Sequence, residues 1–184
     1  MTQEKDRTQN QAASLYALTA SLLEYPDQEV RQRLRYAGEV TTEIFPEGEA
    51  SLKGFSEAVA PFSAEDWEEK YVSTFDVLAA CCLDVGYQVF GEDYNRGQLM
   101  AQLKGLHRRC GNDCGTELPD FLPNVLRLLP RLNYSESAQI AREFVVPAVK
   151  KMLESLSKVE NPYRDLLKFS ELLVSRDYLS SGVA

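Results

Sequence analysis

The apolar residues of this chain recur mostly with the spacing of a helix. In the first segment Leu15, Leu18, Leu22 and Leu23 share one face of a helix, and similar stripes follow along the chain. No alternating apolar and polar run bounded by hairpin turns is present, and the one tempting run, residues 84–90, is short. The pattern predicts an all-α fold, a single-domain helical bundle.

Prolines and glycines predict where the first helices end. The first helix ends near Tyr25, and Pro26 suits the first turn of a second helix that runs to about residue 37. Gly38 then ends this helix by taking a left-handed conformation. A third amphipathic stretch covers residues 49–60, so the chain opens with helices joined by short turns.

Side chains that can cap helices mark the next two starts. Ser63, with Asp66 three residues later, resembles a capping box, and its helix carries Trp67, Tyr71 and Phe75. Asp93 or Asn95 caps the following helix. That helix is expected to carry an apolar stripe of Leu99, Leu103 and Leu106. Gly111 is expected to end it, and residues 111–116 to form the loop that follows.

The second half of the chain also divides at prolines. The sequence ELPDFLP, residues 117–123, is predicted to open a helix, because the first amides of a helix have no partner that a proline removes. That helix breaks near Pro130, and the next covers residues 135–159 with a kink at Pro147. Asn161 followed by Pro162 predicts the start of a last helix.

The composition fits one globular domain. The chain has 184 residues, of which 44% are hydrophobic and 26% are charged, enough to bury a sizeable core. We expect a single domain over residues 1–184, with polar tails at residues 1–9 and 180–184 that fray.

The charge balance limits the possible partners. With 28 acidic and 20 basic residues the net charge is −8, which repels nucleic acid and anionic lipid. The charge favours a cationic partner, or it serves only to keep the protein soluble. The polar N-terminus resembles no targeting signal, and no apolar run reaches the length of a membrane span. We therefore expect a cytoplasmic protein without stable membrane insertion.

Conventional enzyme chemistry is not visible in the sequence. His107 is the single histidine, and it lies among Lys104, Arg108 and Arg109 without a carboxylate that would tune it as a base. No glycine-rich phosphate loop, nucleophile elbow or zinc-protease pattern occurs. The sequence predicts a protein that is not an enzyme and needs no cofactor.

The four cysteines leave two interpretations open. Cys81 and Cys82 are adjacent, whereas Cys110 and Cys114 are separated by three residues across a glycine-containing turn. Four thiolates can bind zinc or an iron–sulfur cluster, but adjacent cysteines in a helical segment rarely ligate one ion together. The favoured interpretation has no metal, with buried small side chains in the first pair and free thiols in the second.

Two apolar stretches are candidates for binding. Residues 81–91 are expected to be an irregular apolar loop, which either lines a groove or fills the core. In ELPDFLP, Asp120 is either a helix cap or, together with Phe121 and the two prolines, part of a negative and apolar lip. Such a lip suits a peptide that carries arginines and a leucine-rich stretch, because it offers charge-assisted hydrogen bonds and apolar burial together.

Three motifs resemble the TorD/DmsD/NarJ family, whose members are dedicated chaperones for molybdenum-cofactor oxidoreductases. Residues 71–76, YVSTFD, are similar to its Y-x-x-x-F-D segment, and residues 91–100, GEDYNRGQLM, to its G-x-x-x-x-R-G-x-x-M segment. ELPDFLP matches its E-L-P-D-x-L-P signature. The motifs occur in the family's order and spacing, and the pattern is closer to the NarJ branch.

The resemblance implies a function. The protein would bind the N-terminal segment of a molybdenum-enzyme catalytic subunit, often a twin-arginine leader or its remnant, until cofactor insertion is complete. The clients of such helpers include nitrate, dimethyl sulfoxide and selenate oxidoreductases. A small cysteine-based metal or redox-sensing protein using Cys81, Cys82, Cys110 and Cys114 is the rival hypothesis, and a helical adaptor is a third.

The resemblance also suggests a shared peptide groove. The expected charge partners are Glu117, Asp120 and Asp76, and the expected apolar wall is Tyr71, Phe75, Phe90, Phe121 and Pro123. Core packing is the alternative role for Tyr71 and Phe75, which lie four apart on one helix face. Supporting positions are Arg96, Gly97, Leu118 and Pro119, with Arg96 expected to hold Asp76, Glu92 or Asp120 in place. The chain departs from the branch at Arg127, a cation where members usually carry an acidic residue.

Overall fold

The computed structural model describes residues 2–77 and 81–180. Within these ranges the chain is helical and forms no strand, apart from one isolated antiparallel bridge between Asp84 and Phe121. The helices are α1 (Thr2–Leu22), α2 (Val30–Ile44), α3 (Glu49–Val59), α4 (Ala64–Phe75), α5 (Val85–Phe90), α6 (Tyr94–Arg109), α7 (Leu122–Leu128), α8 (Tyr134–Ile140), α9 (Val146–Ser155) and α10 (Tyr163–Tyr178). The predicted all-α fold is confirmed.

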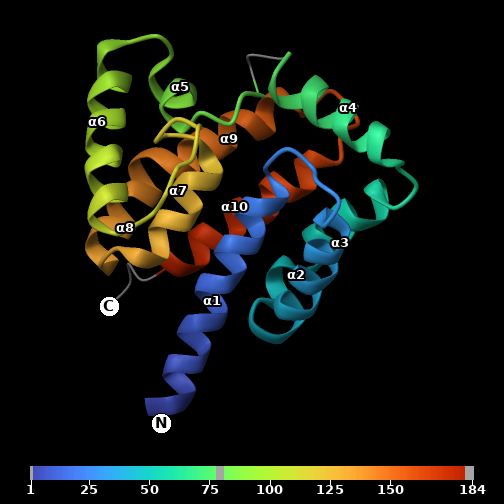
Figure 1. Cartoon of the computed structure of the whole chain (residues 1–184), viewed down its shortest axis with the longest axis horizontal. Coiled ribbons are helices and arrows are strands. Elements are labelled where there is room, and N and C mark those ends of the chain that lie inside the picture. The colour runs from blue at the N-terminus through green and yellow to red at the C-terminus, as the bar shows by residue number, and fades with distance from the viewer. Residues whose placement is uncertain (1, 78–80, 181–184) are drawn as a thin grey trace.

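The last helix runs through the middle of the bundle (Figure 1). Helix α10 contacts α3 and α9, while α1 lies between α2 and α7. Helix α5 packs on α9 and α6. The buried apolar side chains of these helices form one continuous core, which brings the end of α1, the end of α4 and the start of α7 into one assembly.

An aromatic cluster fixes α4 against α10. The Trp67 Nε1 atom donates a hydrogen bond to the Tyr163 hydroxyl over 2.9 Å. The rings of Phe55, Tyr71 and Phe75 pack on Tyr163 with centroid distances of 5.5, 6.0 and 4.8 Å. Aromatic pairs of this kind contribute about 0.5–1.5 kcal/mol each beyond their buried area. The core role considered for Tyr71 and Phe75 is therefore present in the structure.

The predicted capping residues act where the sequence places them. The Ser63 hydroxyl accepts from the Asp66 amide at 3.1 Å, while the Asp66 carboxylate accepts from the Ser63 amide at 2.8 Å. Asp93 caps α6, and the Asn161 side chain accepts from the amide of Tyr163 at 3.0 Å. Each cap satisfies an amide that the helix leaves unpaired.

Three local predictions are wrong. Helix α2 continues through Gly38 to Ile44, because Val40 and Thr41 extend its buried face past the glycine. It also begins at Val30, so Pro26 lies ahead of it. Most of the expected irregular stretch 81–91 is also helical, since residues 85–90 form α5 and pack on α9.

The predicted long helix over residues 135–159 is divided. Helix α8 leads into a π-helical segment, Ala141–Val145, and α9 begins at the next residue, with Pro147 in its first turn. Proline lacks an amide hydrogen and crowds the preceding turn, so a wider turn at this point relieves the conflict. Helix α9 ends at Ser155, four residues before the predicted end.

The chain ends differ from the expected tails in one respect. Residues 2–9 belong to α1, whereas residues 1 and 181–184 lie outside the described part of the chain. Among the helices of the described ranges, none is both long enough and apolar enough to cross a membrane.

Candidate functional site

A pair of tyrosines marks the surface where the first motif meets the end of α1. Tyr71 of α4 is 6% exposed, and its ring packs edge-on against Tyr25 with centroids 5.5 Å apart. Tyr25 is 51% exposed, and its hydroxyl donates to Glu68 over 2.9 Å. The hydrogen bond to Glu68 is the main reason that the pKa of Tyr25 is raised. Tyr71 therefore belongs to the core, while the Tyr25 ring that packs on it is exposed to solvent.

Carboxylates from three parts of the chain act on Tyr71 through their charge. Burial is the largest cause of the raised pKa of the Tyr71 hydroxyl. The negative charges of Asp76, Glu117 and Glu24 raise that pKa further, so the hydroxyl lies in the negative field of all three carboxylates. We call the following six residues the acidic rim: Glu24, Tyr25, Glu68, Tyr71, Asp76 and Glu117.

A surface pocket adjoins the rim at Glu68. It has a volume of about 540 Å³ and lies between the segment after α1 and the first turns of α4. Its lining includes Asp27, Glu29 and Glu68, together with Trp67 and the Arg31 side chain that lies over the Trp67 ring. The pocket is large enough to receive side chains of a bound polypeptide, so the rim has a hollow beside it.

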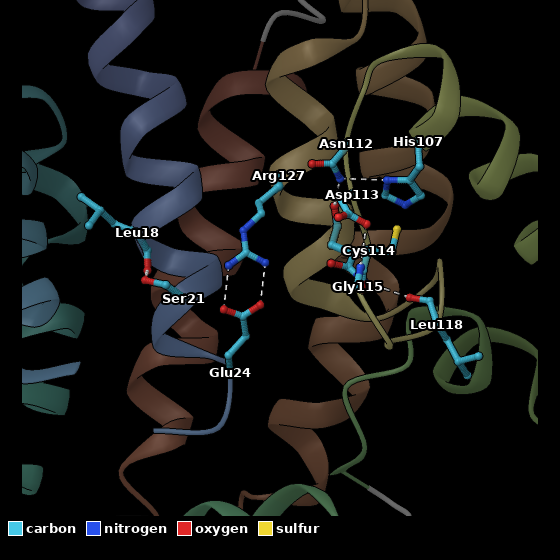
Figure 2. A network of polar contacts seen from close by, with 11 residues as sticks. Leu18, Ser21, Glu24, His107, Asn112, Asp113, Cys114, Gly115, Leu118 and Arg127 are labelled. Carbon is cyan, nitrogen blue, oxygen red and sulfur yellow. Dashed lines mark hydrogen bonds and ion pairs between the residues drawn. The ribbon is translucent and has the colours of Figure 1, made fainter. Parts of the chain in front are cut away.

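One strong ion pair crosses the rim. Figure 2 shows the Arg127 guanidinium reaching from α7 to Glu24, just beyond the end of α1. The two contacts measure 2.6 and 2.7 Å, one to each carboxylate oxygen. The Arg127 and Glu24 side chains are 24% and 37% exposed, so the pair is partly removed from water. Parallel bonds of this kind are among the stronger ion pairs in proteins.

Asp120 lies inside the protein rather than on the rim. Its side chain is 0% exposed, and its carboxylate accepts from Arg96 at 3.2 Å and from the Gly86 amide at 3.1 Å. Arg96 also binds Asp84 at 2.8 Å. The expectation that Arg96 holds Asp120 in place is confirmed, but the expected surface role of Asp120 does not fit this burial. Asp120 instead ties the ELPDFLP turn to α5 and α6.

Burial and the neighbouring charge of Asp120 raise the pKa of Asp84, while Arg96 acts in the opposite direction. Two carboxylates thus share one guanidinium at the base of the turn. Backbone bonds extend the connection, since the Val85 amide donates to the Asp120 carbonyl and the Leu122 amide to the Leu83 carbonyl, each over 2.8 Å.

A histidine and two asparagines hold the other side of this turn. The His107 Nε2 atom lies 2.9 Å from the Pro119 carbonyl, and Asn112 Nδ2 lies 2.8 Å from His107 Nδ1. Asn112 also donates to the Asn124 carbonyl at 3.1 Å. Because Asn112 is the donor toward Nδ1, the His107 ring carries its proton on Nε2 and donates to Pro119. Burial lowers the pKa of His107, so the neutral ring is favoured.

These contacts hold the backbone of the ELPDFLP turn but leave two of its side chains exposed to solvent. Asn124 Nδ2 donates to the Leu118 carbonyl at 3.1 Å, and Figure 2 shows Leu118 on the turn beside α7. The Leu118 side chain is nevertheless 44% exposed, and Glu117 is exposed beside it. A rigid turn therefore presents one apolar and one acidic side chain to solvent.

The remaining predicted residues lie in different places. Phe75 and Pro123 are buried, and Phe121 is half-buried at the start of α7. Half-buried Phe90 packs on Phe144 of the π-helical segment with centroids 6.1 Å apart. Gly97 is exposed on α6. Tyr71 packs on Phe75 with centroids 5.2 Å apart, so these two wall residues lie in the core behind the rim, whereas Phe90 packs elsewhere, on Phe144.

Comparison with known proteins gives the chain a family. No protein-family model matches it. It is 30% identical over 154 residues to the probable nitrate reductase molybdenum cofactor assembly chaperone NarJ of Bacillus subtilis, covering 83% of each chain. This chain belongs to the TorD/DmsD/NarJ family, on its NarJ branch. NarJ of Escherichia coli strain K12 is 26% identical over 175 residues, which cover 91% of this chain and 74% of that protein.

Sequence reasoning within this family missed half of the rim. Glu24, Tyr25 and Glu68 were not among the expected site residues, although Tyr25 directly precedes Pro26 at the predicted end of the first helix. The signal that could have found this surface was Tyr25, a large aromatic residue at the predicted end of the first helix. Their partners Tyr71 and Arg127 lie far away along the sequence, so local pattern alone does not pair them.

The cysteines of this NarJ-branch chain form no metal centre in the described ranges, where no group of three or more histidine, cysteine or acidic side chains is placed to hold an ion. Burial raises the pKa of Cys81 to about 12, and it also raises the pKa values of Cys82 and Cys114. Such thiols stay protonated at neutral pH, which makes them poor ligands and poor nucleophiles. The structure gives the cysteine-based rival no support.

Proposed function

We propose that this chain is a cytoplasmic chaperone that binds the N-terminal leader, or a leader remnant, of a molybdenum-cofactor oxidoreductase catalytic subunit. It would hold that subunit until cofactor insertion and assembly are complete, before export or docking at a membrane. Membership of the NarJ branch supports this role, since the relatives are named as nitrate reductase molybdenum cofactor assembly chaperones. The protein acts by binding, without chemical turnover.

The acidic rim is the observation that carries the peptide-binding part of the proposal. Exposed Tyr25 and Leu118 offer apolar contact area, while Glu24, Asp76 and Glu117 supply negative charge. A segment with arginines followed by apolar residues complements this combination, since charge orients the chain and apolar burial adds affinity.

The predicted site residues then divide by role. Asp76, Glu117 and Leu118 meet the bound segment, and Phe121 lies at the edge of the same surface. Tyr71 supports the exposed Tyr25 ring from the core. Asp120, Arg96 and Pro119 position the turn that carries Glu117, through the contacts of the Asp120 carboxylate and the Pro119 carbonyl. Phe75 and Pro123 support the site from the core.

A binding experiment tests this assignment. The double variant Glu117→Gln with Leu118→Ala removes the exposed charge and apolar contact without touching a buried contact. We expect it to weaken binding of the client's N-terminal peptide about tenfold, a loss of about 1.4 kcal/mol. Tyr36→Ala with Glu39→Gln makes the same two kinds of change on the exposed face of α2 and should stay within about twofold of the parent.

Titration calorimetry measures both affinities, and circular dichroism checks that both variants remain helical. Equal affinities for the two variants would remove the ELPDFLP turn from the binding surface. Affinity capture from the native cell identifies the client: we expect a molybdenum-enzyme catalytic subunit whose capture fails when its N-terminal segment is deleted.

A further inference from the structure

Arg127 is the only residue of α7 that reaches solvent. The other six residues of this helix, Leu122 to Asn124, Val125, Leu126 and Leu128, are buried. Helix α7 directly follows the ELPDFLP turn, so a segment bound at that turn meets α7 through Arg127. This side chain extends to the segment just after α1 and binds Glu24 (Figure 2).

The geometry of the pair shows what Glu24 can bind. Both carboxylate oxygens face a planar guanidinium at 2.6 and 2.7 Å, so Glu24 is held as an acceptor for an arginine fork. Its side chain keeps 37% of its exposure, which leaves it reachable from solvent. Its sequence neighbour Tyr25 packs on Tyr71 at the centre of the rim.

We propose that Glu24 is the carboxylate that receives an arginine side chain of the client segment, and that Arg127 occupies this position until the client displaces it. The inference rests on the proposed peptide-binding function and names a binding residue and its internal competitor. One guanidinium fork replaces another, so Glu24 keeps its partner, and the displaced Arg127 returns to water.

The exchange also predicts which cation is preferred. A lysine ammonium is a point charge that cannot make two parallel bonds, so it does not replace the Arg127 fork on equal terms. An arginine does. The internal competitor therefore makes the rim discriminate between peptides with the same charge, because a weakly bound cation leaves Arg127 in place.

The chain contains a matched control for the ion pair. Arg109 binds Glu136 through contacts of 2.8 and 2.7 Å, joining the end of α6 to α8. Removing Arg109 changes the net charge by the same amount as removing Arg127. Neither Arg109 nor Glu136 is part of the rim.

The experiment compares four variants of the full chain. The probe is a synthetic peptide with two adjacent arginines ahead of a leucine-rich stretch, together with versions that carry citrulline or lysine at those positions. The variants are Arg127→Gln, Glu24→Gln with Arg127→Gln, Arg109→Gln, and Arg109→Gln with Glu136→Gln. Fluorescence anisotropy gives the dissociation constants, and circular dichroism shows that each variant is folded.

We expect Arg127→Gln to bind the arginine peptide about three- to tenfold more tightly than the parent, as for a partly buried competing ion pair. The Glu24→Gln, Arg127→Gln chain has the parent's net charge and should bind more weakly than the parent. Both Arg109 variants should stay within about twofold of the parent. The gain from Arg127→Gln should be small for the lysine peptide and absent for the citrulline peptide.

The outcomes separate this inference from the proposed function. Suppose that the parent binds the arginine peptide, but Arg127→Gln does not raise the affinity, or adding Glu24→Gln to it does not lower the affinity again. The proposed exchange is then wrong, while the peptide-binding function stands. Equal gains for Arg127→Gln and Arg109→Gln would reduce the effect to net charge and would also overturn it. A parent that binds no arginine peptide contradicts the proposed function itself. Should Arg127→Gln fail to fold, Arg127→Lys keeps the charge without the fork and should bind more tightly than the parent by a smaller factor.

Discussion

At the scale of single residues, the ELPDFLP turn depends on one buried carboxylate. Gly86 leaves room for Asp120, since a Cβ atom at Gly86 would lie 2.7 Å from an Asp120 oxygen and 3.1 Å from the Arg96 side chain. We expect Gly86→Ala to lower the free energy of unfolding by about 1–3 kcal/mol, because the added methyl group overpacks a buried ion pair. Urea unfolding followed by circular dichroism measures this loss.

Gly105 provides the comparison for this change. It lies inside α6, and a Cβ atom there would meet nothing within 4 Å. Gly105→Ala should therefore stabilise the protein by about 0.5–1 kcal/mol, as alanine is the better helix former. A stabilising Gly86→Ala would mean that Asp120 does not need its present position.

His107 makes the same turn sensitive to pH. Burial lowers its pKa below the ordinary value of 6.5, so its contribution to stability is complete above about that pH. It is lost as the pH falls through the lowered pKa, because protonated Nδ1 would face the Asn112 amide group. We therefore expect the urea concentration at the midpoint of unfolding to decrease as the pH is lowered from about 7.5 to about 5.5.

The variant His107→Gln tests the cause, since glutamine can still donate to the Pro119 carbonyl but does not titrate. His107 is the single histidine of the chain, so no other imidazole contributes in this window. The pH dependence of the variant should be clearly shallower than that of the parent. An unchanged slope would assign the effect to carboxylates instead.

At the scale of helices, two glycines that looked alike in sequence behave differently. Gly38 lies inside α2 with no atom within 4 Å of an added Cβ, whereas Gly111 follows α6 with φ of +60°. Gly38→Ala should stabilise the protein by about 0.5–1 kcal/mol, while Gly111→Ala should destabilise it by about 1–2 kcal/mol. Thermal unfolding of both variants measures the two signs, and a loss in Gly38→Ala would indicate that the glycine serves packing.

The same contrast shows what the sequence predicts well. The Ser63–Asp66 capping box and the aromatic stripe of α4 depend on residues a few positions apart, and both were predicted. The α2 end was not, because the buried face contributed by Val40 and Thr41 outweighs the preference of glycine for helix ends. Helix α5 was missed for a similar reason: its packing on α9 is a long-range contact.

The candidate site divides along the same line. Its motifs pointed to Tyr71, Asp76 and Glu117, which the structure brings to one rim. Arg96 was among the expected partners of Asp120, but the contact with the Gly86 amide and the complete burial of the carboxylate come from long-range packing that the sequence does not show. Glu24 meets Arg127 across 103 positions, and no local pattern reports such a pair.

At the scale of the whole molecule, the net charge of −8 and the acidic rim act together on a basic partner. Raising the ionic strength from about 0.1 M to about 1 M shortens the screening length from about 10 Å to about 3 Å. The arginine peptide should then lose about tenfold or more in affinity, whereas its citrulline version should change little, since its binding rests on apolar burial.

A pair of charge variants tests whether this salt dependence comes from the rim or from the net charge of the whole protein. Two double variants each remove two exposed carboxylates. The rim variant is Asp76→Asn with Glu117→Gln, and the control, on α2 and the turn after it, is Glu39→Gln with Glu47→Gln. Both variants have the same net charge. Because screened interactions are short-ranged, only the rim variant should flatten the salt dependence of peptide affinity. Equal slopes in the two variants would show that the partner responds to the whole acidic surface and that the rim has no special place in its capture.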